Sequence, residues 1–268
     1  MKKTMISLLL ALVLTLCLCT GALAEGTLRV GMECNYAPYN WTQTDDSNGA
    51  VSIDGGGYAG GYDVEVAKLL AEKLDMELVI VKTEWDGLIP ALQSDMIDLV
   101  IAGMSPTEKR KMSVDFSDLY YETQLVVVVR KDSPYAAAKT LTDFANAKIT
   151  GQLNTVHYEV IDQLVGCNKT PAMDSFPTMI VALSSGAIDG YISELPGAMS
   201  ACASNTDLAF VELEDGFVME GDDSSVAIAI KKGREDLLGQ INEALAGISA
   251  EARAELMAQA VTNQPAAE

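Results

Sequence analysis

Residues 105–110, with the sequence Ser-Pro-Thr-Glu-Lys-Arg, carry the residue types that can bind a small anion. They follow the apolar run 97–102, so a buried strand is predicted to lead directly into this polar segment. Ser105, the proline after it and Glu108 fit an N-cap, a first helical position and the acidic member of a capping box. The free N–H groups of a helix start and the planar guanidinium of Arg110 favour a carboxylate or phosphate. An ordinary helix cap, with Arg110 pointing to solvent, is the alternative.

Short apolar runs alternate with helical patterns on both sides of this segment. The runs at 28–32, 78–81 and 97–102 predict strands, and the patterns at 63–74 and 85–93 predict helices. This βαβα order indicates a parallel sheet. A second series predicts strands at 125–129, 148–152, 187–192 and 225–230, and helices at 156–165, 178–184, from 196, 234–248 and 250–260. Two similar α/β halves result, and in open α/β sheets ligands bind beyond the carboxyl ends of the strands.

Several motifs occur in a recognisable order along the chain. They are Tyr36-Ala37-Pro38-Tyr39, Gly61-Tyr62-Asp63, Trp85-Asp86-Gly87-Leu88-Ile89-Pro90, the Ser-x-Thr-x-x-Arg of residues 105–110, and Phe116-Ser117. With these motifs the chain resembles the amino-acid-binding solute receptors of ABC importers, the bacterial extracellular solute-binding proteins of family 3. The resemblance covers almost the whole chain after residue 24.

The resemblance implies an α/β fold with two lobes, of the periplasmic-binding-protein type II class. In this fold two parallel or mixed sheets are joined by two hinge strands. One lobe would comprise residues 25–122 together with 225–268, and the other lobe residues 123–224. Because two such halves face each other across a cleft, we expect the binding site between the lobes.

A free amino acid needs a cationic partner for its carboxylate and an anionic partner for its ammonium. The resemblance assigns the carboxylate to Ser105, Thr107, Arg110 and Thr155, and Gln152, in the loop before Thr155, is a further ligand-binding candidate. For Thr155 an ordinary helix cap is the alternative. Glycine is usual in the family where Asn154 stands, so the backbone of this loop is a departure from the family pattern.

By the same resemblance, the ammonium partner is Glu194, at the carboxyl end of the predicted strand 187–192. Relatives often have aspartate there, and the longer glutamate shifts the ligand by about one bond length. Backbone carbonyls near Ala102 and Gly103 would accept the remaining ammonium protons. The sequence therefore has candidates for both charged groups of an amino acid.

The resemblance also implies that Tyr36 and Trp85 are the aromatic walls on either side of the ligand's side chain, and an aromatic face suits an aliphatic stem or a cation. Packing in the core is the alternative for both. Glu33 ends the first strand, where members of the family that bind cationic amino acids carry an acid. Glutamine binders also carry one there, so the sequence leans toward a polar or cationic ligand such as arginine or lysine.

The first 24 residues have the parts of a secretory signal: a basic start, an apolar run at 6–18, and Ala-Leu-Ala before Glu25. A lipid anchor at Cys17 or Cys19 is the alternative, although leucine precedes both cysteines. No later segment approaches the roughly 20 apolar residues that a membrane span needs. We therefore expect export across the cytoplasmic membrane, to the periplasm or the cell surface.

The chain has 18 basic and 38 acidic residues, a formal charge of −20. Loss of Lys2 and Lys3 with the signal sequence brings the charge to −22. Nucleic acid is a poor partner for so acidic a protein. No residue spacing suggests a metal site or a cofactor, and we expect a monomer.

Three cysteines remain after residue 24: Cys34, Cys167 and Cys202. An oxidising compartment makes a bridge between Cys167 and Cys202 plausible, with Cys34 free, although sequence cannot assign the pairing. The single histidine, His157, is predicted on a helix surface. The stretch 54–61 matches G-x-G-x-x-G but follows a polar, acidic loop, so a hairpin is predicted there instead of a dinucleotide site.

These observations favour a receptor that captures a free L-amino acid and delivers it to an ABC transporter permease with its ATPase. Such a protein is not an enzyme. The alternative is an enzyme on the same fold, such as a relative of cyclohexadienyl or arogenate dehydratase, with Glu33 or Glu194 as general acid. A sensor or adhesin-like domain is a third hypothesis.

Overall fold

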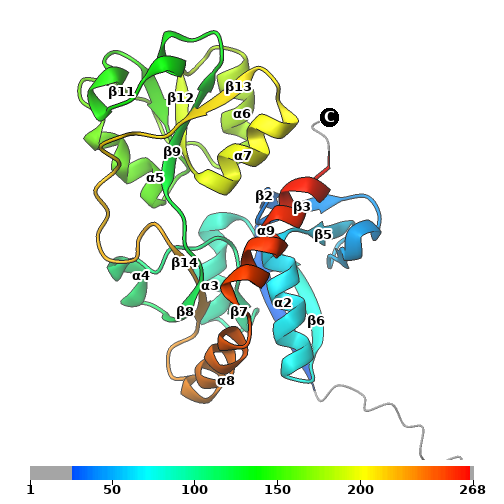
Figure 1. Ribbon diagram of the computed structural model, residues 1–268. Helices are drawn as coiled ribbons and strands as arrows, with labels where there is room; N and C mark the ends of the chain where they lie inside the picture. Colours follow the sequence, from blue (N-terminus) through cyan, green and yellow to red (C-terminus); the bar gives the residue numbers. More distant parts are fainter. Residues whose placement is uncertain (1–25, 266–268) are drawn as a thin grey trace, which may run out of the picture.

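The computed structural model describes residues 26–265, which form two α/β lobes (Figure 1). The predicted signal sequence, residues 1–24 with Cys17 and Cys19, lies outside the described residues. Within the described part of the chain, the helices lack the combination of length and apolar character that a membrane crossing requires. The prediction of a two-lobed α/β fold is confirmed.

The first lobe is built around a five-stranded mixed sheet. In spatial order its strands are β6 (Glu77–Lys82), β1 (Thr27–Met32), β7 (Leu99–Val100), β14 (Val226–Ile230) and β8 (Asp115–Tyr121). β1 pairs in parallel with β6 and β7, whereas β14 runs antiparallel to β7 and β8. The parallel strands therefore end at the same edge of the sheet.

The second lobe repeats this plan. In spatial order its strands are β11 (Asn168–Lys169), β10 (Lys148–Thr150), β12 (Gly190–Glu194), β9 (Leu125–Arg130) and β13 (Leu208–Val211). β10 is parallel to β11 and β12, and β9 is antiparallel to β12 and β13. Val126 and Val128 of β9 pack into one hydrophobic cluster and Val127 and Val129 into another, which explains the unbroken apolar run in the sequence.

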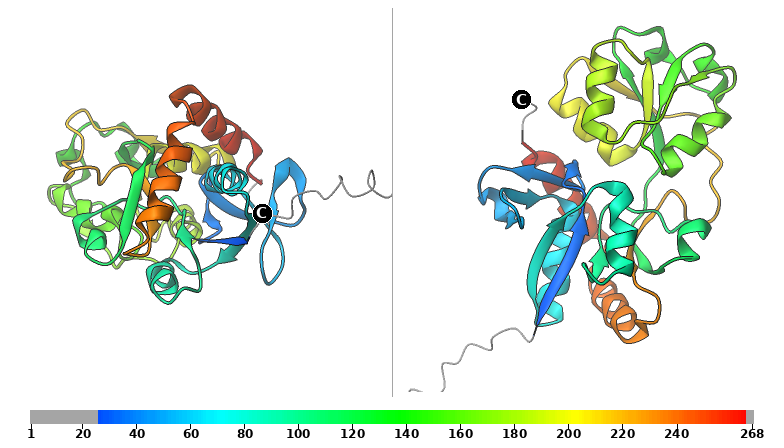
Figure 2. Two further views of the ribbon diagram at one scale, coloured as in Figure 1. Left: turned by 90° about the horizontal axis from the view of Figure 1, so that it is seen from below. Right: turned by 180° about the vertical axis from the view of Figure 1, so that it is seen from behind.

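A small four-stranded antiparallel sheet adjoins the first lobe on the side of the second lobe (Figure 2). Its order is β2 (Asn35–Tyr36), β3 (Asn40–Gln43), β5 (Tyr58–Gly60) and β4 (Val51–Ser52). β4 and β5 pair as a hairpin around the glycine-rich stretch, as predicted. The sequence analysis did not predict the other strands of this sheet, nor β8, β11 or β13.

Helices cover both sheets. The first lobe has α2 (Tyr62–Lys73), α3 (Leu88–Gln93), α4 (Glu108–Lys111), α8 (Glu235–Ala246) and α9 (Ala250–Asn263). The second lobe has α5 (Val156–Glu159), α6 (Phe176–Ser184) and α7 (Leu195–Ser204). Short 3-10 turns are η1 (Ser47–Gly49), η2 (Trp85–Gly87), η3 (Pro134–Ala137), η4 (Leu141–Phe144) and η5 (Val160–Gln163). The predicted helix 156–165 is thus a single α turn followed by a 3-10 turn.

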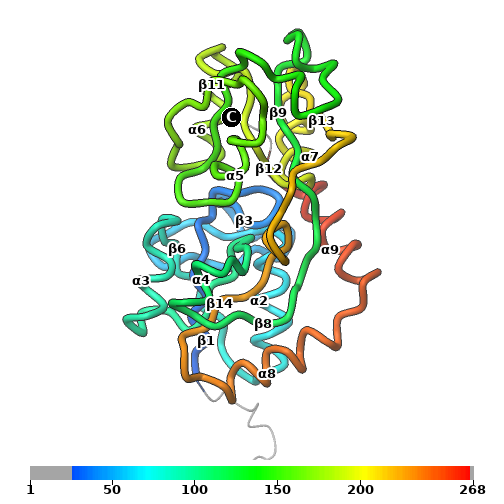
Figure 3. The backbone as a smooth tube through the Cα atoms, turned by 90° about the vertical axis from the view of Figure 1, so that its left-hand side faces the viewer, coloured from blue at the N-terminus to red at the C-terminus, as the bar shows by residue number. Residues whose placement is uncertain are grey.

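The chain passes between the lobes twice. It crosses from β8 to β9 and returns from β13 to β14, and the two crossing segments lie on the same side of the molecule (Figure 3). With two covalent connections on one side, the lobes can separate on the other side while both sheets stay intact.

The described cysteines are all free thiols. The suggested bridge between Cys167 and Cys202 is therefore wrong. Cys167 packs beside the cluster that contains Val127 and Val129, whereas Cys202 lies on α7 beside the other cluster. The two residues lie against different parts of the core, which sequence spacing cannot reveal.

Gly61 fixes the start of α2, the helix of the Gly-Tyr-Asp motif. Its φ of 124° and ψ of 175° belong to a region that essentially only glycine adopts. A Cβ at this position would lie 2.7 Å from the carbonyl carbon of Tyr39 and 2.9 Å from Cα of Asn40. Because both obstacles are backbone atoms, they cannot move aside cheaply.

We therefore expect Gly61→Ala to lower the free energy of unfolding by about 3 kcal/mol or more, since it adds a backbone clash to dihedral strain. Urea unfolding measures this loss. Gly186→Ala is the matched control, because Gly186 also has a positive φ of 78° but no atom within 4 Å of the added Cβ. Its cost should stay near 1 kcal/mol. Equal losses for the two variants would contradict this account of Gly61.

Candidate functional site

The candidate site lies where strand ends of the two lobes face each other. In the first lobe Glu33 follows β1, and residues 101–110 follow β7. In the second lobe residues 151–157 follow β10, and Glu194 is the last residue of β12. Because β1 and β7 are parallel to each other, and β10 and β12 likewise, the carboxyl ends of these four strands carry all four segments to the interface between the lobes.

A small cavity between the lobes brings together most of the predicted residues. Two lining residues, Val156 and His157, were not predicted to bind the ligand. The other eight were predicted: Tyr36, Trp85, Ala102, Gly103, Ser105, Arg110, Gln152 and Thr155. Its volume is about 10 Å³, enough for roughly one water molecule. The two lobes therefore lie in close contact around the cavity.

A second cavity of about 470 Å³ opens beside the first. Trp85, Arg110 and Thr155 line both cavities. Thr107, which does not line the small cavity, lines the larger one. Arg110 thus lies where the two cavities adjoin.

The Arg110 guanidinium is held by both lobes. Its Nη1 donates to the carbonyl of Ser105 at 2.8 Å, and its Nη2 donates to the carbonyl of Asn154 at 3.0 Å. The guanidinium carbon lies 5.1 Å from the centre of the Trp85 ring, within range of a cation–π contact. Burial lowers the pKa of Arg110 to about 10, so the group stays charged at neutral pH. Its contacts are carbonyls and a ring, and none of the described carboxylates lies within ion-pair distance of it.

The helix after Ser105 begins two residues later than predicted. α4 starts at Glu108, and Thr107 is its N-cap, with Oγ1 accepting from the backbone N–H of Arg110 at 3.3 Å. The Ser105 carbonyl instead accepts from the Thr107 N–H and from Arg110. A single turn has little macrodipole, so the cationic element of the site is the Arg110 side chain and not a helix start.

The loop after β10 contacts the first lobe through Asn154. Asn154 has a φ of 57°, a left-handed conformation that asparagine tolerates better than most residues. Although the family usually has glycine here, asparagine can therefore adopt the same loop geometry. The side-chain amide of Asn154 donates to Oδ1 of Asp86 across the interface at 2.9 Å. Thr155 is the N-cap of α5, and its hydroxyl donates to the Gln152 carbonyl at 2.6 Å.

Glu33 contacts the second lobe through Gln152. The Gln152 amide donates to both carboxylate oxygens of Glu33, at 3.0 and 3.1 Å, and to the Asp174 carbonyl at 3.0 Å. Both side chains are buried. Burial raises the pKa of Glu33 to about 7, although the Gln152 hydrogen bond opposes that rise. Glu33 is thus a buried carboxyl that a nearby cation would ionise.

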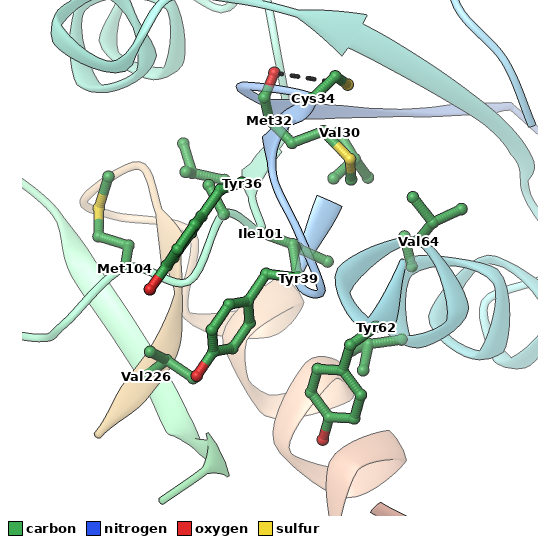
Figure 4. Packing of buried hydrophobic residues seen from close by; sticks show 14 of the residues in the cluster. Val30, Met32, Cys34, Tyr36, Tyr39, Tyr62, Val64, Ile101, Met104 and Val226 are labelled. Atoms are coloured by element: carbon green, nitrogen blue, oxygen red, sulfur yellow. Dashed lines mark hydrogen bonds between the residues drawn. The ribbon is translucent and has the colours of Figure 1, made fainter. Parts of the chain in front are cut away.

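Tyr36 closes the small cavity with an aromatic contact across the lobes. Its ring lies 3.9 Å, centre to centre, from Phe176 at the start of α6, with 11° between the planes. On its other side Tyr36 stacks on Tyr39 at 5.0 Å, and the two rings lie near each other in Figure 4. Tyr36 also packs on Gly103, where an added Cβ would lie 3.2 Å from its ring. Phe176 was not predicted, because no local signal distinguishes it from a core residue.

The backbone at Gly103 is positioned by a buried hydrogen-bond chain. The Gly103 N–H donates to the Tyr120 hydroxyl at 3.0 Å, and that hydroxyl donates to Asp63 at 2.7 Å. Asn40 donates to the other Asp63 oxygen, also at 2.7 Å. Burial raises the pKa of Asp63 to about 6, so its two donors oppose a large desolvation cost. The Asp63 of the Gly-Tyr-Asp motif therefore fixes the segment 102–103 from behind.

His157 and Glu194 are buried together in the second lobe. The prediction that His157 lies on a helix surface is wrong, because α5 is one turn long and turns this side chain into the interface. Its Nε2 lies 2.9 Å from Oε2 of Glu194, with only 6% and 2% of the two side chains exposed. Glu194 therefore lies directly behind His157 and does not line the small cavity.

Unpartnered polar atoms gather at this place. Among residues 26–265, five buried side-chain atoms make no hydrogen bond, and four of them belong to this site: the Tyr36 hydroxyl, both His157 ring nitrogens and Oε2 of Glu194. Nε2 and Oε2 are close, but their alignment does not make a hydrogen bond. Buried polar atoms are nearly always paired in native proteins. This arrangement can bind a small molecule that has both donors and an anionic group.

The chain matches the family model for bacterial extracellular solute-binding proteins, family 3, over residues 28–261. It is 31% identical to the L-cystine-binding protein TcyJ of Escherichia coli K12 over 222 residues, 83% of this chain and 77% of the relative. It is 30% identical to the arginine-binding extracellular protein ArtP of Bacillus subtilis 168 over 254 residues, 91% and 92% of the two chains.

A solved structure shares this fold. It is an amino acid ABC transporter substrate-binding protein from Streptococcus pneumoniae bound to L-arginine, with a TM-score of 0.78 and 27% identity. The similarity covers 89% of this chain and 95% of that one.

We expect Tyr120→Phe to lower the free energy of unfolding by about 2–4 kcal/mol, because it leaves the Gly103 N–H without a partner and the buried Asp63 with one donor fewer. Chemical denaturation measures the change. Tyr121→Phe alters the adjacent, half-buried tyrosine and should cost less than about 1 kcal/mol. If both variants lose the same small amount, the chain from Gly103 to Asp63 does not support the site.

Proposed function

This chain belongs to the bacterial extracellular solute-binding proteins of family 3, and from that premise we propose that it binds a free L-amino acid between its lobes. We further propose that it acts as a monomer in the periplasm or at the cell surface. There it would deliver its ligand to the permease and ATPase of an ABC transporter. The family consists of solute-binding proteins, so it gives no support to the dehydratase alternative.

One observation carries the proposal: the buried polar atoms that lack partners gather around a cavity to which both lobes contribute. Arg110 supplies a permanent positive charge there, and Glu194 supplies a carboxyl. An L-amino acid carries the two complementary groups on neighbouring atoms. We assign its carboxylate to Arg110, with Ser105, Thr107 and Thr155 nearby, and its ammonium to Glu194 and the carbonyls of Ala102 and Gly103.

The relatives' names guide the choice of ligand side chain. TcyJ is named for cystine and ArtP for arginine, whose side chains differ while their α-carboxylate and α-ammonium are the same. Glu33 is a buried carboxyl at the first-lobe edge of the interface, held by an amide and not by a cation. It can therefore neutralise a distal guanidinium or ammonium beside Tyr36 and Trp85. These features favour a cationic amino acid, with arginine first.

Binding requires the lobes to separate. The small cavity holds about one water molecule, so an amino acid needs the stack of Tyr36 on Phe176 to open. We propose residues 25–122 with 225–268 as one moving lobe and residues 123–224 as the other. The two crossing segments would then act as the hinge, and the ligand would replace direct contacts between the lobes.

The proposal predicts that Arg110→Ala weakens L-arginine binding by about 2–5 kcal/mol, the usual cost of removing one member of a desolvated charge pair. Isothermal titration calorimetry measures the affinity. Lys109→Ala removes the neighbouring, exposed positive charge and should leave the affinity within about threefold of the parent, because a rim charge contributes little.

Two results would count against the proposal. One is saturable L-arginine binding by Arg110→Ala with the parent's affinity. The other is the absence of binding by the parent protein to every one of the 20 standard amino acids.

The ligand class is tested by Glu33→Gln, which keeps the shape and an acceptor oxygen but removes the charge. We expect it to weaken arginine and lysine binding by about 1.5–3 kcal/mol, the worth of a hydrogen bond to a charged group, and to weaken glutamine binding much less. Titration of parent and variant with arginine, lysine, glutamine and histidine measures the difference. Equal losses for all four, or tightest parental binding to a neutral amino acid, would exclude the cationic assignment.

A further inference from the structure

The contact between His157 and Glu194 leaves buried polar atoms of the site without hydrogen-bond partners. Their Nε2 and Oε2 atoms are 2.9 Å apart, yet these atoms and His157 Nδ1 make no hydrogen bond within the described part of the chain. Both side chains are almost fully buried. An unpaired buried charge is far more costly than an unpaired neutral group. The surroundings of the pair therefore decide which charges it can carry.

The groups packed around the pair come from several elements. Arg110 of α4 is the charge that acts on His157, and the edge of the His157 ring faces Phe176 of α6 at 5.6 Å. The Tyr36 hydroxyl of β2 adjoins α7, where a Cβ on Gly197 would lie 3.1 Å from it. Tyr191, on the same strand as Glu194, is buried and stays protonated because burial raises its pKa well above the usual value. Glu33 faces Gln152 at another part of the interface.

These surroundings favour an uncharged pair. Burial raises the pKa of Glu194 well above its usual value, and burial together with the Arg110 charge lowers the pKa of His157 well below its usual value. At pH 7 the carboxyl therefore keeps its proton while the imidazole is neutral. A neutral carboxyl cannot form an ion pair with a ligand ammonium, so its proton has to leave before that ion pair forms.

We propose that His157 seals Glu194 in its protonated form, and that an amino acid releases this proton to solvent when its ammonium binds Glu194. This inference rests on the proposed function. The carboxyl loses H⁺ and becomes a carboxylate, and the ligand ammonium keeps all its protons and supplies the compensating charge. His157 does not take up the proton, because burial and the Arg110 charge oppose an imidazolium and the ligand ammonium neutralises the Glu194 carboxylate that would favour one. His157 is thus a positioning residue that makes ligand binding depend on pH.

Calorimetry counts the released protons directly. The observed heat of L-arginine binding is measured at pH 7 in phosphate, HEPES and Tris, whose ionisation heats differ. Because Glu33 also has a raised pKa and would release part of a proton to a cationic ligand, Glu33→Gln is the reference protein. We expect the Glu33→Gln protein to release about one proton per ligand bound, and the parent protein somewhat more.

The affinity should depend on pH as well. Between pH 5.5 and 7.5 the association constant of the reference should rise by up to about tenfold per pH unit, then level off above about pH 8.

The direction of this pH dependence follows from the protons bound in each state. Below the raised pKa of Glu194 the free protein holds the carboxyl proton, whereas the complex does not. Lowering the pH therefore favours the free protein and lowers the association constant. His157→Ala in the same reference admits water to Glu194, which lets the carboxyl ionise before the ligand arrives. Proton release should then fall toward zero and the pH slope should flatten. Glu235→Gln, which changes an exposed carboxyl on α8, is the control and should keep release near one proton.

A second measurement uses the parent protein alone and does not depend on the variants folding. His157 is the only histidine in the sequence, so ¹⁵N-histidine labelling of protein purified without a histidine tag gives one imidazole. It should remain neutral from pH 5 to 8 with and without L-arginine. A His157 that titrates near its usual pKa of about 6.5, an imidazolium formed on binding, or a reference-protein heat that does not vary with buffer would overturn the inference. In each of these cases the proposed function survives, whereas failure of every standard amino acid to bind would overturn both.

Discussion

The organisation of this protein depends on the cost of burying charged and titratable side chains in one interface. Arg110, Glu33 and Glu194 lie there with carbonyls, an amide and an imidazole as their neighbours, and no ion pair within the described residues neutralises Arg110 or Glu33. Removing such groups from water costs several kcal/mol each unless opposite charges reach them. A zwitterion carries both signs of charge, so its binding offsets the desolvation cost that these groups have in the free protein.

The fold places the two groups that we assign to the ligand's charges in different lobes. The cationic group follows β7 in the first lobe, and the carboxyl assigned to the ammonium ends β12 in the second. Rigid supports hold each half: the chain from Gly103 through Tyr120 to Asp63 on one side, and the Thr155 contact with Gln152 on the other. Because the supports lie within the lobes, the lobes can move apart without disturbing either half of the site.

The sequence predicted the four strands that carry the site, β1, β7, β10 and β12, and most of the cavity residues. Apolar runs mark buried strands, and the carboxyl ends of those strands position the next residues of the chain. The strands β8, β11 and β13 were not predicted. Eight of the residues assigned by motif line the small cavity. The errors concern features that only tertiary contacts decide. Ser105 and Thr107 are both good N-caps; in the structure Thr107 caps α4, and the Arg110 side chain donates to the Ser105 carbonyl. His157 on a short polar turn and Phe176 at a helix start gave no local sign that both would be buried between the lobes.

The central claim is that Arg110 and Glu194 hold the two charged groups of one amino acid across the interface. A crystal structure of the protein grown with L-arginine tests it most directly. We expect the ligand carboxylate within hydrogen-bond distance of the Arg110 guanidinium, its α-ammonium within the same distance of Glu194, and His157 turned away from its present 2.9 Å contact. An arginine whose α-ammonium lies elsewhere, while His157 still covers Glu194, would contradict the account.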